Sequence, residues 1–137
     1  TTKNTIKRVE FCKFINWITN ENNIHLKRDI YYVIDSADIS LDNAIKIFND
    51  AIIIGIGCKD ITIQEMIEKM KENDTKLEWT YGYSDDDLYS IANETIINSK
   101  ELYKKCLNSS VSYFDTSIDR YKIYEEIFKY IEKEMVK

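Results

Sequence analysis

A run of isoleucines in the middle of the chain, AIIIGI at residues 51–56, limits the available folds more than any other feature. Taken alone, the run fits a buried strand, because β-branched residues favour extended backbone. Taken with the residues before it, the run continues a stripe of apolar residues at helical spacing. The earlier members of that stripe are Leu41, Ala44, Ile45 and Phe48.

We interpret the run as the end of a helix that begins after a capping residue, Ser40. Its last turns are apolar on every side, which is typical of a buried helix. Gly55 and Gly57 then end the helix, because glycine adopts left-handed conformations without steric cost. The segment Ala44–Ile54 is therefore predicted to be the buried centre of a bundle.

The clearest helix start lies just after this segment. TIQE at Thr62–Glu65 is a capping box, in which the threonine hydroxyl and the glutamate carboxylate each accept a backbone N–H of the other residue. Ile61 and Met66 stand at the two positions of a hydrophobic staple. A helix is predicted over 63–72.

Helical spacing of apolar residues predicts further helices. They cover residues 5–20, 23–37, 85–107 after a cap at Ser84, and 117–136. Within the second of these, IYYVI also fits a strand. Residues 108–117 are predicted to be a loop. The segment KLEWTYGY alternates with a period of two but has no evident partner strand, so we predict an extended connection that its aromatic residues pin to the bundle.

These segments together predict an all-α fold: a single domain over residues 1–137, built as a bundle of five to six helices with a buried central helix. An apolar fraction of 44% and a charged fraction of 31% fit a globular protein. The three cysteines are far apart, which favours a reducing compartment, the cytoplasm. No apolar run is long enough to span a membrane. The abundance of Ile, Asn, Lys, Tyr and Asp is typical of an AT-rich genome.

The net charge of −5 bears on the class of partner. Nucleic-acid binding draws most of its affinity from a basic surface, so we do not expect nucleic acid as a partner. An acidic chain fits a protein partner with a basic surface.

No catalytic, cofactor or metal site is predicted. His25 is the single histidine, and no serine or cysteine stands in a recognisable relation to it. Asp85, Asp86 and Asp87 are consecutive, so on a helix their carboxylates point about 100° apart and do not converge on a cation. Gly55-Ile56-Gly57 lacks the third glycine of a dinucleotide-binding loop.

Two alternatives remain open. DITIQEMIEKM at residues 60–70 resembles, at a generic level, the second-helix opening of bacterial regulators, which implies a helix-turn-helix DNA-binding regulator over Ala44–Glu72. Against it, the gap after the first helix is long and the second helix is not basic. The other alternative is an enzyme with an unrecognised site.

Aromatic and acidic residues gather before and within the helix that Ser84 starts. Tyrosine adds a large contact area with few rotors, so we predict a partner-contact surface there. Its residues are Tyr81, Tyr83, Asp85, Asp86 and Tyr89, whereas Trp79 is assigned to the core.

The last helix carries an apolar seam at 3-4-3 spacing, formed by Tyr121, Tyr124, Phe128, Ile131 and Met135. We expect the seam to pack inside the bundle, with self-association through this C-terminal helix as the alternative. The predicted function is a small non-catalytic protein–protein interaction module. A phage- or virus-type regulator or inhibitor of a host protein, acting in the host cytoplasm, is the specific hypothesis.

Overall fold

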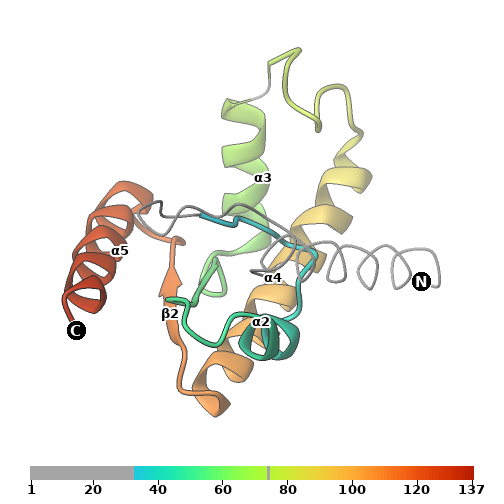
Figure 1. Ribbon diagram of the computed structural model, residues 1–137. Coiled ribbons are helices and arrows are strands. Elements are labelled where there is room, and N and C mark those ends of the chain that lie inside the picture. The colour runs from blue at the N-terminus through green and yellow to red at the C-terminus, as the bar shows by residue number, and fades with distance from the viewer. Residues whose placement is uncertain (1–32, 74) are drawn as a thin grey trace. The chain divides into compact units, whose positions relative to one another are not determined.

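The computed structural model describes residues 33–73 and 75–137 (Figure 1). The chain divides into two compact units between residues 51 and 52. The described part of the first unit holds one helix, α2 (Leu41–Ile47), whose cap Ser40 accepts a hydrogen bond from the N–H of Asn43. The helix predicted over 5–20 lies outside the described residues. So does most of the one predicted over 23–37, and its described end, 33–37, is not helical.

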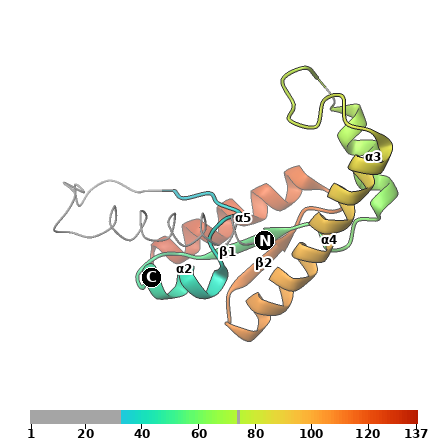
Figure 2. The same ribbon diagram turned by 90° about the vertical axis from the view of Figure 1, so that its right-hand side faces the viewer.

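The second unit contains two strands and three helices. Its elements, in chain order, are β1 (Ile54–Gly57), α3 (Ile63–Glu72), α4 (Asp85–Asn108), β2 (Ser112–Asp115) and α5 (Arg120–Met135). The two strands pair in parallel, with Ile54 opposite Ser112 and Gly57 opposite Asp115. Helix α4 lies on one side of the strand pair and α5 on the other (Figures 1 and 2).

The prediction of an all-α bundle around a central helix is wrong. The described residues contain four helices and a two-stranded parallel sheet. Helix α2 begins after the predicted cap Ser40 but ends at Ile47, residues 48–53 form neither helix nor strand, and β1 begins at Ile54. The segment predicted to be the loop 108–117 contains β2, which supplies the hydrogen-bonding partner that the isoleucine run needs to be a strand.

Close contacts with α4 at Gly55 and with the Tyr113 ring of β2 at Gly57 explain the glycines of β1. A Cβ added at Gly55 would lie 2.6 Å from the Cys106 Sγ, and one added at Gly57 would lie 2.5 Å from the Tyr113 hydroxyl oxygen. Neither glycine has a positive φ, so the prediction that they end a helix in left-handed conformations is wrong. They are required because any side chain on that face of β1 would meet atoms already in place.

The core of this unit lies between α3 and α4. Its buried members are Ile61, Met66, Ala92 and Ile96. Ile61 and Met66 are the predicted staple pair, and both are buried in this one cluster. The capping box is also confirmed, because the Thr62 N–H donates to the Glu65 carboxylate at 2.9 Å and the Glu65 N–H donates to the Thr62 hydroxyl at 3.2 Å. The predicted bounds of α3 therefore match the observed ones.

Helix α5 packs on β2 through one face only. Ile127 is buried, and Tyr130 stacks edge-on against Phe114 of β2 with ring centroids 5.6 Å apart. The apolar seam, predicted to pack inside the bundle, is mostly exposed instead. Phe128, in its middle, has 66% of its surface exposed. That prediction is wrong because α5 meets a strand pair of limited width and not a ring of helices.

Candidate functional site

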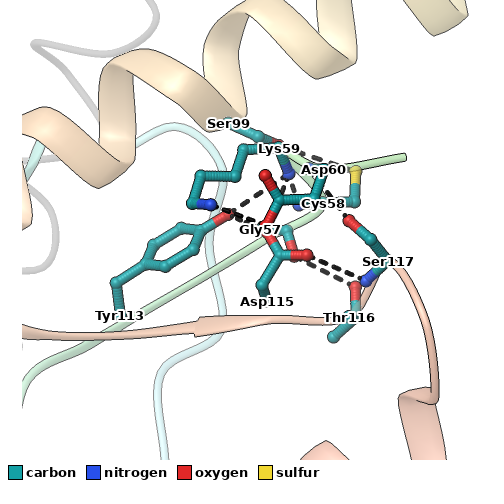
Figure 3. Close-up of polar contacts among 9 residues, drawn as sticks. All are labelled: Gly57, Cys58, Lys59, Asp60, Ser99, Tyr113, Asp115, Thr116 and Ser117. Carbon is teal, nitrogen blue, oxygen red and sulfur yellow. Dashed lines mark hydrogen bonds and ion pairs between the residues drawn. The ribbon is translucent and has the colours of Figure 1, made fainter. Parts of the chain in front are cut away.

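Polar side chains converge where the two parallel strands end (Figure 3). Parallel strands carry their carboxyl ends to the same edge of a sheet, so the loops that follow Gly57 and Asp115 leave side by side. In open parallel sheets this edge is where ligands commonly bind. We define the strand-end cluster by its side chains and N–H donors, which come from Cys58, Lys59, Asp60, Ser99, Tyr113, Asp115, Thr116 and Ser117.

Asp115 is the centre of the cluster. Its carboxylate accepts the Tyr113 hydroxyl at 2.7 Å, the Lys59 backbone N–H at 2.8 Å and the Ser117 backbone N–H at 3.1 Å. Burial raises the pKa of this carboxyl, but the hydrogen bonds from Ser117, Tyr113 and Lys59 together outweigh burial and hold the pKa below its usual range. Asp115 is therefore an anion at neutral pH.

Tyr113 is held in its protonated form. Alternation along β2 turns its ring toward α4, where it stacks edge-on against Tyr103 with centroids 5.2 Å apart. Burial, and then the hydrogen bond to the Asp115 anion, raise the pKa of the phenol far above its ordinary value. A phenol in this state keeps its proton, donates a hydrogen bond to one fixed acceptor and does not serve as a base.

The Lys59 ammonium is likewise held in its charged form. It pairs with the Asp60 carboxylate at 2.6 Å and lies 4.7 Å from the centre of the Tyr103 ring. The hydrogen bond to Asp60, opposed by slight desolvation, raises the pKa of Lys59. A nucleophilic lysine needs the opposite shift, a lowered pKa.

Serines close the cluster onto neighbouring elements. The Ser99 hydroxyl of α4 accepts the Cys58 N–H at 3.1 Å, and the Ser117 hydroxyl accepts the Asp60 N–H at 3.1 Å. The Lys69 ammonium of α3 donates to the Ser117 carbonyl at 3.1 Å. Each loop that follows a strand is therefore tied to the other strand's loop and to a helix.

The chemistry of the strand-end cluster is that of a clamp. General acid–base work needs pKa values moved toward neutrality, whereas those of Tyr113, Lys59 and Asp115 are all moved away from it. No buried side-chain N or O in the described residues lacks a hydrogen-bond partner. The polar groups of the cluster therefore hydrogen-bond to one another and hold the two strand ends together.

None of the residues of the strand-end cluster was predicted from the sequence to be functional. The signal lay in two segments, IGIGCKD and SYFDTS, in which a short β-prone run is followed directly by polar residues. Only the parallel pairing of the two runs shows that these polar residues meet.

The predicted contact residues all lie at one end of the α3–α4 pair. Tyr81 and Tyr83 stand in the segment before α4, and Asp85, Asp86 and Tyr89 in its first turns. All five are exposed. Residues 76–82 form successive turns, so the prediction of an extended connection pinned by its aromatics is wrong.

Trp79 is the main correction in this region. It was assigned to the core, yet 67% of its surface is exposed, and its ring meets Tyr83 edge-on with centroids 6.1 Å apart. Leu77, two residues earlier, is 96% exposed. Gly82 has a φ of 78°, which lets the chain turn between the aromatic residues. We call the exposed set Leu77, Trp79, Tyr81, Tyr83, Asp85, Asp86 and Tyr89 the aromatic loop surface.

Acidic groups on this surface have separate roles. Asp87, next to the surface, accepts the Ser84 backbone N–H and completes a second capping box. Asp85 pairs with Lys71 of α3 at 2.7 Å. Asp86 makes no ion pair with any residue of the described ranges.

Comparison with known proteins found no relative of this chain. No protein family, curated protein or solved structure matches the chain. Within residues 33–73 and 75–137, no three His, Cys, Asp or Glu side chains gather in a way that would hold a metal ion. In the same ranges no helix combines the length and apolar character that crossing a membrane requires.

Proposed function

We propose that this chain is a non-catalytic protein-binding module and that the aromatic loop surface is its contact site. The observation that carries the proposal is the exposure of Trp79 in a loop where Leu77, Tyr81 and Tyr83 are exposed as well, next to the exposed Tyr89 of α4. Large apolar side chains gathered on a surface mark binding sites, and tryptophan and tyrosine dominate the energetics of protein interfaces.

Local charge indicates the kind of partner. Glu78, Asp85 and Asp86 border the aromatic side chains, and of these only Asp85 is neutralised by an ion pair among the described residues. An acidic rim around an aromatic centre favours a partner whose surface is basic around an apolar pocket. A regulator or inhibitor of a phage or virus type acts in this way, by occupying the surface of another protein.

The strand-end cluster supports the non-catalytic part of the proposal. The pKa values of Tyr113, Lys59 and Asp115 are all moved away from neutrality, which holds these three groups in unreactive protonation states. The order of elements does not support the helix-turn-helix alternative, because that motif needs a short turn between two helices and β1 stands between α2 and α3 within Ala44–Glu72. The proposed compartment is the cytoplasm, of the host if the source is a virus, since Cys58 and Cys106 are both free thiols.

Quantitative affinity capture from extracts of the source cells tests this proposal. Trp79→Ser and Leu77→Ser each remove one apolar side chain from the surface, and Leu107→Ser is the matched control, since Leu107 is 62% exposed at the other end of α4. We expect one partner to be retained by the wild type and by Leu107→Ser, and to fall at least tenfold with either loop variant. Equal retention by all four proteins would refute the assignment of this surface.

A charge variant tests the acidic rim separately. Asp86→Lys is expected to slow association with the captured partner and to weaken its dependence on salt, because rim charges act mainly on the association rate. Unchanged association in low and high salt would show that the rim has no part in recognition. Circular dichroism of each variant checks that the fold is retained.

A further inference from the structure

The exposed side of α5 is a second surface, independent of the aromatic loop surface. The α5 seam consists of Tyr121, Tyr124, Phe128, Ile131 and Met135. Tyr121 is 79% exposed, and Phe128 is exposed to a similar degree. The helix rotates by about 100° per residue, so these side chains form one stripe beside the face that carries the buried Ile127. The stripe faces away from its own unit's core.

Spacing in the seam is that of a helix-pairing surface. Tyr121, Phe128 and Met135 are seven residues apart, and Tyr124 and Ile131 stand three residues after the first two. Apolar residues alternating at intervals of three and four place knobs into the holes of a facing helix. A helix of this length offers about 24 Å of such a seam at about 1.5 Å per residue.

Charges beside the seam indicate which helix would fit it. Four exposed residues follow the outer edge of the seam with alternating sign: Lys122, Glu125, Lys129 and Glu132. None of the four makes an ion pair with another described residue. We call these residues the charged flank. The signs along the helix are positive, negative, positive, negative. A second copy that runs in the opposite direction presents them in the reverse order, so each charge faces one of opposite sign.

We propose that the α5 seam binds the same seam of a second copy of this chain, with the two helices antiparallel. Lys122 then faces Glu132 of the second copy, and Glu125 faces its Lys129, each pair occurring twice by symmetry. The axis passes close to residue 127, which brings the two Phe128 rings together at the centre of the seam. The charged flanks lie on the same side of the helix pair, as equivalent positions do in antiparallel packing.

An interface limited to one helix from each copy is small, so the copies exchange between monomer and dimer with concentration. Sedimentation velocity of the full chain, from low-micromolar to near-millimolar concentration, measures this equilibrium. We expect the wild type to shift toward dimer across this range. Phe128→Asp is expected to remain monomeric, and the control Leu107→Asp, exposed on α4, to dimerise like the wild type. A wild type that stays monomeric, or a Phe128→Asp variant that still dimerises, would overturn the proposal.

Charge reversal tests the antiparallel arrangement itself. Glu125→Lys places two lysines opposite each other twice in the dimer and is expected to weaken dimerisation at least tenfold. The double variant Glu125→Lys with Lys129→Glu restores opposite charges at both contacts and is expected to recover dimerisation to within about threefold of the wild type. Failure of the double variant to recover would refute this pairing. Neither outcome depends on the aromatic loop surface, so the two proposals fail separately.

Discussion

Replacing Gly55 by alanine tests the contact between β1 and α4, on which the observed fold depends. The new Cβ would lie 2.6 Å from the Cys106 Sγ, closer than non-bonded atoms approach, and Cys106 is fully buried and has little room to move. Inserting a methyl group into a packed core of this kind costs about 1–3 kcal/mol. Gly55→Ala is therefore expected to lower the free energy of unfolding by that amount.

A second substitution makes the test specific. Cys106→Ala removes the obstructing sulfur and by itself costs about 1 kcal/mol, as the loss of one buried heavy atom does. With the sulfur gone, the nearest remaining atoms to the new Cβ are Leu102 Cγ and Tyr113 Cδ2, both at 3.5 Å, an ordinary contact distance. The double variant should therefore be more stable than the sum of the single effects predicts, by about 1–3 kcal/mol.

Urea unfolding followed by far-ultraviolet circular dichroism, in the presence of a reductant, measures all four free energies. The double-mutant cycle then isolates the interaction between the two sites. Single effects that add to within about 0.5 kcal/mol would show that the two residues do not meet. In that case the strand at residues 54–57 would not lie against α4, and the close-approach explanation of the glycines would be refuted.

Further predictions concern the clamp, a cap and the loop. Because hydrogen bonds hold the folded pKa of Asp115 below its unfolded value, the stabilising effect of this carboxylate is present above about pH 4 and is lost as the pH falls through the folded pKa. Asp115→Asn should therefore lower the free energy of unfolding by about 1.5–3 kcal/mol at pH 7, measured by urea unfolding. The same variant should lose less stability than the wild type on acidification, and an unchanged acid profile would contradict this. Thr62→Ala removes half of a capping box and should cost about 1 kcal/mol, whereas a cost near zero would mean that the cap is not formed in solution. In a Trp17→Phe background, the fluorescence of Trp79 should be quenched by acrylamide almost as readily as free tryptophan, and strong protection would place Trp79 in the core.

Local signals in the sequence predicted several elements correctly. The capping box at Thr62 and the cap at Ser84 correctly predicted where α3 and α4 begin, because a cap depends only on residues within one helical turn. The bounds of α5 were predicted to within three residues at its start and one at its end by apolar periodicity alone. Tyr81, Tyr83 and Tyr89 are exposed, and their contact with a partner stays a prediction.

Long-range contacts decided what the sequence left ambiguous. The isoleucine run at residues 51–56 fits a strand by itself and a helix together with the residues before it, and the partner of β1 lies beyond two helices in the chain. Hydrogen bonds to that partner, and the space that Gly55 leaves for Cys106, select the strand. The same pairing creates the strand-end cluster, since Lys59 and Asp115 meet only when the strands run in parallel.

Exposure was also decided by tertiary structure. The α5 seam and Trp79 are apolar, and periodicity shows only that such residues share a face or a segment. Whether another element covers that face depends on which surfaces the rest of the chain has available. In this protein the sequence by itself determined where helices begin and which residues are apolar. The tertiary structure determined which apolar residues are buried, because burial depends on residues distant in the chain.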